Sequence, residues 1–367
     1  MREAKILIVL DSKKYKEKED GLRNEIGNLC EPEFYFTDYE NRLIKIFHGI
    51  SGIGNFLSHI SYWMLSLVAA ISLFAKKRGN LYRSKVFINP IVGIFYCFLL
   101  AIFDGRDRVT VAGFLFVDKK SKLYLVLRKA FVRFAYGRAS KIIVYSRGEV
   151  QVYSKLFPRL AQKFVFVRYG RDYDIFAERE YESCAPYVAS GGVSNRDYDT
   201  LARALNILEK RRPSMICKIA TRPDSCTLSC NPGNLALLHD IRLETFGSFL
   251  AKSLFVVLPL KDTPLSAGHM ALLESMYRRK IIIVADIPGV RDYVDESTVY
   301  FYKAGDSSNL AEVIDYVFEN MESEIVQGKA VLAQNVFRST YRFSSFLKRI
   351  VLEAASLPAF DDCERGA

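Results

Sequence analysis

The chain lacks the cysteine patterns that stabilise small secreted domains or bind zinc. Its 367 residues include seven cysteines, an odd number, and no two are spaced as Cys-x-x-Cys. Cys226 and Cys230 are four residues apart, but no second pair completes a zinc set. We therefore expect no disulfide framework and a reducing compartment.

The sequence also shows no signal peptide and no clear membrane span. The first apolar run, residues 5–10, has only the length of a strand. Pro90–Phe103 is uncharged, but a helix of this length spans roughly 21 Å, short of a hydrocarbon core of about 30 Å. Asn89 and Pro90 suit its first turn, so we predict a buried helix.

Residues 46–75 contain no Lys, Arg, Asp or Glu. Their large apolar residues alternate at three and four positions, and smaller polar residues occupy the other face. This one-sided pattern favours a surface or packed helix over a span. It could pack on a sheet or lie in the interface of a membrane.

Acidic residues are scarce in the first half of the chain. Residues 1–180 contain 31 Lys and Arg against 18 Asp and Glu, a net charge of +13, and the remainder has 21 against 23, a net charge of −2. Apolar residues interleave at helical spacing with eight basic residues between positions 119 and 141, where no acidic residue occurs. A membrane-side or acceptor-side role is our interpretation for Lys119, Lys120, Lys122, Arg128, Lys129 and Arg133.

Two other interpretations of this basic helix remain. Its apolar side could pack in the core with the basic side in water, because both uses need the same pattern. Nucleic-acid binding ranks lowest, since no recognised motif accompanies the charge, and we expect no nucleic-acid partner.

Apolar strand candidates alternate with helical patterns almost throughout, which indicates an α/β fold with parallel sheets. We predict strands at 5–10, 33–37, 86–88, 109–116, 141–145, 164–167, 187–190, 215–220, 241–243, 255–259, 281–284 and 298–302. The charged segment 170–186 interrupts the pattern. We therefore predict two Rossmann-like domains, residues 1–175 and 186–340, facing a cleft.

The segment Pro264–Val294 is the most informative about function. It is typical of a loop, a helix, an apolar strand and a Pro-Gly turn. We expect the helix to begin at Ser266, with the small residues Ala267 and Gly268 in its first turn. Free amides there would bind an anion. Glu274, two turns further on, could accept hydrogen bonds from vicinal hydroxyls, so the segment suits a nucleotide-sugar.

This segment resembles the donor-site signature of retaining glycosyltransferases of the GT-B fold, in the large family four. That signature has two glutamates separated by seven residues; Glu274 matches the second, and Ser266 stands at the first, followed by Ala-Gly-His. A second block, 190–205, resembles the family's first donor-domain strand and helix. Arg196 lies where the family usually has Lys, and Gly192 where it often has Arg. The resemblance covers roughly half of the chain.

The resemblance implies a retaining transfer from a nucleotide-sugar to a glycan or lipid-linked acceptor, at the cytoplasmic face of a membrane. Arg196 and the amides of His269 and Met270 would hold the diphosphate, and Glu274 the ribose. The donor site would further include Gly191, Gly192, Arg222, Ser266, Ala267 and Gly268. No metal and no other cofactor is expected. A C-terminal helix, 341–356, would cross back to the first domain.

The sequence departs from the family in two further places. The glycine-rich loop expected after the first strand is replaced by residues 11–15, Asp-Ser-Lys-Lys-Tyr, and no histidine follows the strand at 109–116. A catalytically inactive GT-B protein that binds a nucleotide or glycan for a partner enzyme is therefore the alternative. A sugar-nucleotide isomerase of similar fold is the third. Arg222, Arg196 and Glu274 could also be an ordinary loop arginine, surface arginine and helix glutamate.

Overall fold

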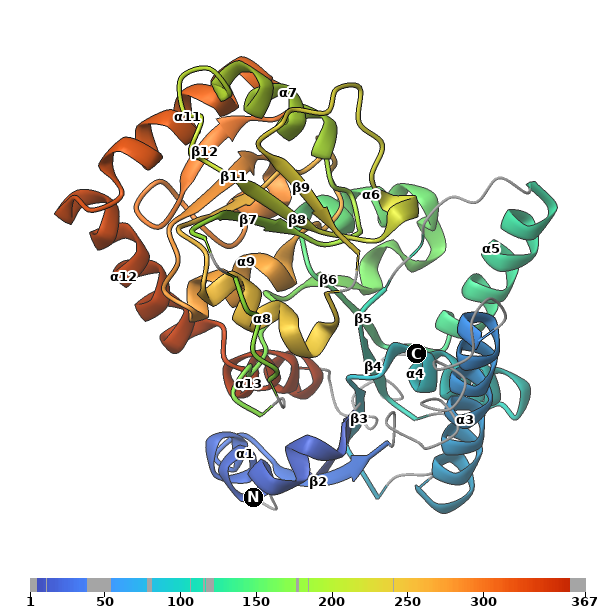
Figure 1. The fold of residues 1–367 in the computed structure, drawn as a ribbon. Coiled ribbons are helices and arrows are strands. Elements are labelled where there is room, and N and C mark those ends of the chain that lie inside the picture. Colours follow the sequence, from blue (N-terminus) through green and yellow to red (C-terminus); the bar gives the residue numbers. More distant parts are fainter. Residues whose placement is uncertain are drawn as a thin grey trace. The chain divides into compact units, whose positions relative to one another are not determined.

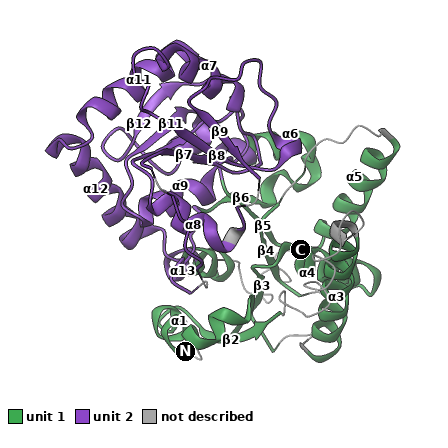
Figure 2. Ribbon diagram, in the orientation of Figure 1, with its two compact units in different colours: residues 1–145, 150–167, 347–367 green, residues 146–149, 168–346 purple. Residues whose placement is uncertain are grey.

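The chain forms two compact α/β units in the computed structural model (Figures 1 and 2). Unit 1 comprises residues 1–145, 150–167 and 347–367, and unit 2 comprises residues 146–149 and 168–346. The structure describes residues 5–10, 12–37, 54–77, 81–105, 107–114, 116, 122–175, 178–183, 185–239 and 241–356.

Unit 1 is built on a parallel six-stranded sheet in the order β2-β1-β3-β4-β5-β6. The strands are β1 (Lys5–Leu10), β2 (Glu31–Phe36), β3 (Ser84–Phe87), β4 (Val109–Ala112), β5 (Lys141–Val144) and β6 (Phe164–Phe166). Its helical elements are η1 (Lys13–Lys18), α1 (Glu19–Ile26), α3 (Gly54–Lys77), α4 (Pro90–Ile102), α5 (Lys122–Tyr136), η2 (Pro158–Lys163), and most of α6 (Arg147–Leu156) and α13 (Phe343–Ala355). Residues 6–10 of β1 are fully buried, as expected of a continuous apolar run inside a parallel sheet.

The helix α4 begins where the sequence predicts. The side chain of Asn89 accepts hydrogen bonds from the amides of Ile91 (3.0 Å) and Val92 (3.2 Å), and Pro90 occupies the first turn. The helix packs between β3 and its neighbouring helices and is largely buried, which confirms the prediction.

The long helix α3 packs on α4 with the face that the sequence marks as polar. Ser58, Ser66 and Ala70 are buried, at no more than 5% exposure. Large apolar side chains lie on the outside, with exposed fractions between 44% and 59% for Ile60, Trp63, Met64, Val68 and Ile71. Packing of this apolar face on the sheet is therefore wrong for Ile60, Met64 and Ile71, because the small residues permit the closer approach to α4. Phe74, at the end of the same stripe, does pack on Tyr96 of α4, with ring centroids 5.8 Å apart. Residues 46–53 lie outside the described residues.

Unit 2 is built on a second parallel six-stranded sheet, in the order β12-β11-β10-β7-β8-β9. The strands are β7 (Val188–Gly191), β8 (Cys217–Ala220), β9 (Leu235–Leu238), β10 (Val256–Leu258), β11 (Ile282–Asp286) and β12 (Tyr300–Lys303). The helical elements are α7 (Tyr198–Leu208), η3 (Pro223–Ser225), α8 (Leu243–Ala251), α9 (His269–Tyr277), α10 (Pro288–Arg291), α11 (Ser307–Asn320) and α12 (Glu324–Thr340). Numbered from β7, the order is 3-2-1-4-5-6, that of the dinucleotide-binding Rossmann sheet.

Eleven predicted strands overlap an observed one, and the strand at 241–243 is wrong. The strand there is β9, Leu235–Leu238, which pairs in parallel with β8 (Cys217 opposite Leu235). Residues 241–243 instead lead into α8. Pro232 and Gly233 make a turn before β9, and this signal marks the true start of the strand.

The end of α9 carries an arginine where its backbone favours glycine. The amide of Lys280 donates to the carbonyl of Ser275 (3.0 Å), and that of Arg279 to Met276 (3.0 Å). This is a Schellman motif, whose central residue is left-handed, and Arg279 has φ = +54°. The Arg279 side chain is exposed, so only its backbone strain opposes folding.

Arg279→Gly should therefore stabilise the protein by about 1 kcal/mol. Thermal denaturation should show unit 2 melting about 2–4 °C higher. Arg279→Ala, which keeps a β-carbon, is the control and should give little of this gain. An unchanged melting temperature for the glycine variant would mean that the left-handed backbone costs nothing here.

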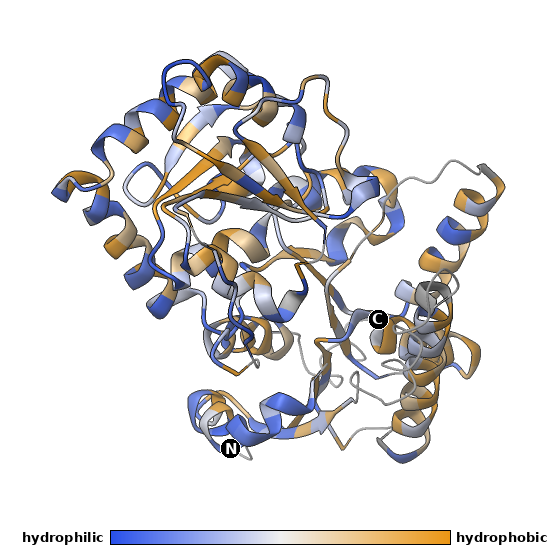
Figure 3. Cartoon of the chain, in the orientation of Figure 1, coloured by the Kyte–Doolittle hydropathy of each residue, from blue (hydrophilic) through white to orange (hydrophobic). Residues whose placement is uncertain are grey.

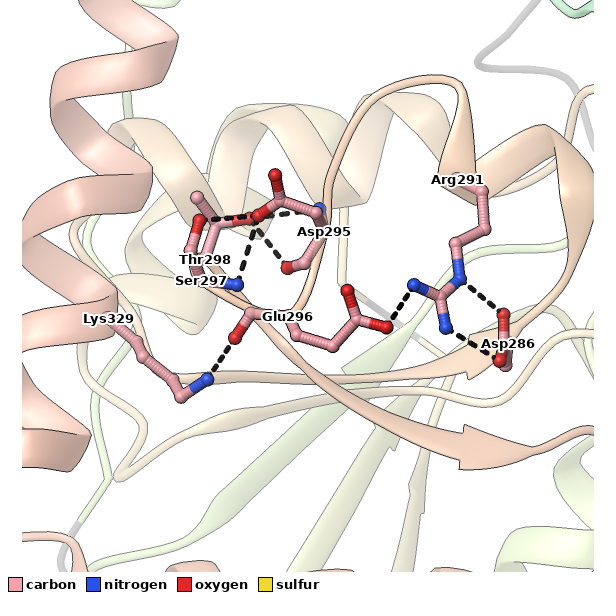
Figure 4. Close-up of polar contacts among 7 residues, drawn as sticks. All are labelled: Asp286, Arg291, Asp295, Glu296, Ser297, Thr298 and Lys329. Carbon is pink, nitrogen blue, oxygen red and sulfur yellow. Dashed lines mark hydrogen bonds and ion pairs between the residues drawn. The ribbon is translucent and has the colours of Figure 1, made fainter.

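An ion-pair cluster fixes the connection between β11 and β12 (Figure 4). The guanidinium of Arg291 binds both carboxylate oxygens of Asp286 (2.6 and 2.8 Å) and also contacts Glu296. Asp295 accepts from the amide (3.0 Å) and hydroxyl of Ser297, and Lys329 of α12 reaches the Glu296 carbonyl. The cluster holds the turn that follows β11, which also contributes to the site below.

Candidate functional site

The candidate site lies where the strand order of unit 2 reverses, between β7 and β10. These strands are neighbours, with Val256 opposite Ala189. The loops that follow them are joined: the amide of Asp197 donates to the Pro259 carbonyl (3.0 Å), and that of Lys261 to Asn195 (3.0 Å). Ligands of open α/β sheets bind at such a switch point, beyond the carboxyl ends of the strands.

Arg196 is a buried cation in the first of these loops. It is 9% exposed, and its guanidinium donates to the carbonyls of Gly191 (2.8 Å) and Ser194 (3.2 Å). Within the described part of the chain it forms no ion pair with a carboxylate. Burial lowers the pKa of Arg196, yet an arginine keeps its charge at neutral pH. A buried positive charge that lies against carbonyl oxygens and the Tyr198 side chain is suited to an anionic ligand.

The start of α9 faces the same guanidinium. The helix begins at His269, after Gly268, and no side chain caps its first turn. A β-carbon on Gly268 would lie 3.2 Å from Nη1 of Arg196, so the guanidinium lies close to the start of α9. Uncapped amides, the positive end of the helix dipole and a guanidinium together form a site for phosphate.

The predicted helix start at Ser266 is wrong. Serine is a preferred N-cap by local propensity, but the Ser266 hydroxyl donates to Glu149 instead (2.6 Å). The N-cap is instead Gly268, whose left-handed backbone (φ = +73°) turns the chain sharply into the helix at His269. Ala267, predicted in the first turn, is buried just outside it.

Gly192 leaves the space that Arg196 fills. A β-carbon on Gly192, which has φ = +113°, would lie 2.4 Å from Nη2 of Arg196. The Gly192 carbonyl accepts from the hydroxyls of Tyr198 (2.6 Å) and Thr221 (2.9 Å). The missing second cation at position 192 is thus a consequence of geometry, because any side chain there would displace the guanidinium. At Gly191 a β-carbon would clash with the Phe246 ring, at 2.5 Å.

His269 is held as a neutral residue. Its Nε2 lies 3.1 Å from the carbonyl of Gly289, and its ring packs on Tyr293, with centroids 4.1 Å apart. Burial lowers the pKa of His269 to about 4. The imidazole therefore anchors the helix start to the turn after β11, and its amide rather than its ring is left for a ligand.

Glu274 is the sixth residue of α9, and its carboxylate contacts the guanidinium of Arg278. Its side chain is 13% exposed and lies 3.5 Å from Arg278, which also binds Glu178 (2.8 Å). A β-carbon on Gly247 of α8 would lie 2.5 Å from the Glu274 carboxylate. Burial raises the pKa of Glu274, and the charges of Arg278 and Arg171 oppose this. A ribose role for Glu274 stays a prediction.

The remaining donor-site residues are more exposed. Met270 is 46% exposed at the helix start, and its carbonyl accepts from the Tyr173 hydroxyl (2.8 Å). Arg222 is exposed at the start of η3, one residue after Thr221. A diphosphate contact for Arg222 stays a prediction.

On α5, apolar side chains are exposed beside the basic ones. Leu123 and Leu127 are 71% and 62% exposed, so packing of this end of the helix in the core is excluded. Arg128 lies over the ring of Phe116 at 4.5 Å, and Arg133 is exposed. Lys129 is half-buried. Lys119 and Lys120 lie outside the described residues, as does the side chain of Lys122.

Residues distant in sequence contribute to unit 2 in ways that local pattern did not reveal. Ser146 and Glu149 have the spacing of a capping box, and only half of it forms: the Glu149 amide donates to the Ser146 hydroxyl (3.1 Å). The Glu149 carboxylate turns instead to Ser266. Asp292 was not predicted at all, and it receives the amide (2.8 Å) and guanidinium (2.7 Å) of Arg147.

The described residues contain no group of three or more His, Cys, Asp and Glu side chains that could hold a metal ion. Metal-independence remains a prediction. One helix among the described residues, α3, is long and apolar enough to cross a membrane by length and composition.

Comparisons with known proteins reveal similarity in structure alone. No protein-family model matches the chain, and no curated protein matches it in sequence. Among solved structures, a glycosyltransferase from Rickettsia africae is 13% identical with a TM-score of 0.58 over 98% of this chain and 100% of that one. The trehalose-phosphate synthase of Burkholderia vietnamiensis is 10% identical with a TM-score of 0.59, over 96% and 100%. Anabaena HepE, solved with UDP-glucose, is 13% identical with a TM-score of 0.56, over 96% and 100%. The chain therefore has the GT-B fold of these glycosyltransferases, with two α/β units that are each built on a parallel sheet.

Proposed function

We propose that the chain is a glycosyltransferase that uses a nucleotide-sugar donor. The observation that carries this proposal is the buried charge of Arg196, which has no carboxylate partner in the described residues and lies against the uncapped start of α9. A diphosphate would supply the missing negative charge at that place. HepE with UDP and starch synthase IV with ADP, two structures of similar fold, were solved with nucleoside diphosphates.

In this proposal the chemistry rests on stabilising the leaving group. Breaking the bond between sugar and diphosphate builds negative charge on the diphosphate. Arg196 and the amides of His269 and Met270 are fixed in place before the reaction, so they can stabilise that charge without reorganising. Retention of the anomeric configuration rests on the family resemblance, and the configuration of the product would test it. Transfer should persist in EDTA if no metal takes part.

The nucleotide is the first property to test. Among UDP, GDP, ADP, CMP and TDP, one nucleotide should raise the melting temperature selectively. At a hundred times its dissociation constant, that nucleotide should add about 2.7 kcal/mol to the free energy of unfolding. The rise should shrink in Glu274→Gln, because the neutral amide accepts ribose hydroxyls less well than a carboxylate. The ligand-induced rise, not the melting temperature itself, is compared, since the substitution also disturbs the pair with Arg278.

The matched control is Asp315→Asn, which alters an ion pair with Arg212 (2.5 Å) on α11 and should leave the ligand-induced rise unchanged. No rise with any nucleotide, from folded protein, would instead support the non-catalytic alternative. Binding without transfer would point the same way.

For the acceptor side, we propose docking on an anionic membrane surface. The apolar stripe of α3, Ile60, Met64, Val68 and Ile71, recurs at helical spacing and is exposed. Figure 3 shows the hydrophobic character of this helix. Its other face, which carries the buried Ser58, Ser66 and Ala70, is engaged with α4. One engaged face and one exposed apolar face suit a helix that lies in the interface, not one that spans.

Charge complementarity makes the membrane the favoured occupant. The exposed apolar residues of α3 and α5 are accompanied in unit 1 by the exposed Lys76 and Arg133 and by the half-buried Arg128 and Lys129. Residues 1–180 carry a net charge of +13. Each basic residue near an anionic surface contributes about 1 kcal/mol. A lipid-linked acceptor and a cytoplasmic location on the inner membrane face belong to the same proposal.

The protein should therefore co-sediment with vesicles that contain phosphatidylglycerol, and less as salt rises. Val68→Glu should reduce the bound fraction at least tenfold, because it places a charge in the apolar stripe. Ile325→Glu is the control, since Ile325 is 72% exposed on α12 of unit 2. Equal pelleting with neutral vesicles would contradict the electrostatic part. A dimer broken by Val68→Glu would show that a second copy covers the stripe.

A further inference from the structure

The Glu149 carboxylate lies against the loop before α9, residues 264–268, which we call the donor loop. It lies 117 residues before Ser266, and its Oε1 accepts hydrogen bonds from the Ser266 hydroxyl (2.6 Å) and amide (3.2 Å). Glu149 is 2% exposed. A carboxylate this deeply buried is retained only where its hydrogen bonds are satisfied, so the contact is a built feature of unit 2.

The four-residue segment Ser146–Glu149 is fitted to the donor loop along its whole length. The Ser146 hydroxyl donates to the Pro264 carbonyl (3.2 Å). A β-carbon on Gly148 would lie 2.1 Å from that same carbonyl, so only glycine permits the approach. Arg147 binds Asp292 beside it, through its amide (2.8 Å) and its guanidinium (2.7 Å). These contacts fix the position of the Glu149 carboxylate relative to residues 264–266.

The contact also determines the state of the Ser266 hydroxyl. A serine has one O–H donor and two acceptor lone pairs. Because its proton is donated to Glu149, the oxygen presents only lone pairs to any other partner. The hydrogen bond to the carboxyl group is short, at 2.6 Å, so this orientation is retained. The loop thus offers an acceptor for hydroxyl groups two residues before Gly268, where α9 begins.

We propose that Glu149 and Ser266 together replace the glutamate that the donor-site signature carries at position 266. Glu149 is a positioning residue: it sets the donor loop and polarises Ser266, whose oxygen accepts a hydrogen bond from a hydroxyl of the donor sugar. The carboxylate has moved from the loop to the start of α6, and the pair recognises the sugar rather than the nucleotide. This inference rests on the proposed function.

The transposition predicts a reciprocal rescue. Glu149→Ser removes the carboxylate, and Ser266→Glu places a second carboxylate against Glu149, so each single variant should lower kcat at least tenfold. The double variant, which returns a single carboxylate to position 266, should recover most of that loss. Residues in contact deviate from additivity in this way, and independent ones do not.

A readout that does not require turnover separates sugar from nucleotide recognition. The dissociation constants of UDP and UDP-glucose are measured for each variant, or those of the corresponding pair if the nucleotide panel selects another base. Affinity for the diphosphate alone should stay within about threefold of wild type, and affinity for the nucleotide-sugar should fall about tenfold or more in each single variant and return in the double. Ser266→Ala should repeat the loss at the sugar, and Asp315→Asn should leave both affinities unchanged. Circular dichroism confirms folding.

The outcomes separate this inference from the function on which it rests. Additive losses in the double variant, from folded protein that still binds the diphosphate, would overturn the transposition alone. An equal loss of affinity for diphosphate and nucleotide-sugar would assign Glu149 a merely structural role. A wild-type protein that binds neither ligand would overturn the proposed function, and this inference with it.

Discussion

Replacing Arg196 with methionine should abolish diphosphate binding without destabilising the free protein. The guanidinium is 9% exposed and is balanced by the carbonyls of Gly191 and Ser194. A buried charge of this kind is costly in the unliganded protein, and an apolar side chain of similar length removes that cost. We expect the free variant to be as stable as wild type or about 1 kcal/mol more stable, and transfer to fall 10²–10³-fold, as for the loss of one stabilising donor.

The opposite signs of the two effects make this prediction specific. If Arg196 were structural, its replacement would lower the stability of the protein. If Arg196 belongs to the site, its replacement lowers ligand binding and transfer instead. The control is Arg203→Met on α7, where the arginine side chain is 47% exposed and pairs with Asp199 at 3.3 Å. That change should have little effect on stability or binding. Diphosphate affinity for Arg196→Met within threefold of wild type would remove Arg196 from the site.

The fold was predictable because its signals are local. β1 is a six-residue apolar run, and α4 starts at Asn89 and Pro90; both lie where the sequence predicts. Arg196 was also singled out from the sequence, by the resemblance of residues 190–205 to the first donor-domain strand and helix of the family. Its burial was not, because the space it fills depends on Gly192 and Gly268, which lie on two different loops.

The errors arise where a distant residue overrides a local preference. Ser266 has the chemistry of an N-cap, but Glu149 takes its hydroxyl, and the helix starts three residues later at His269. The periodicity of α3 identified two faces and could not tell which one is turned inward. Lys85, in the middle of unit 1, is 1% exposed because Asp107 lies 2.9 Å away, and a single sequence does not reveal such a pairing.

Acidification should destabilise unit 2 through His269. The folded protein holds its pKa at about 4, because burial disfavours the charged imidazole, whereas the unfolded chain takes up the proton near 6.5. The stability that the neutral ring contributes is thus complete above pH 6.5 and is lost as pH falls toward 4. A difference of this size corresponds to about 3 kcal/mol.

The measurement is the free energy of unfolding between pH 7 and 4, compared with His269→Gln. Glutamine can still donate to the Gly289 carbonyl but does not titrate in this range. Carboxylates whose pKa is lowered, such as Asp286 beside Arg291, also lose stabilising charge on acidification, so the difference between the two proteins isolates the histidine. The two curves should converge as pH falls, and curves that stay parallel would contradict a neutral, buried His269.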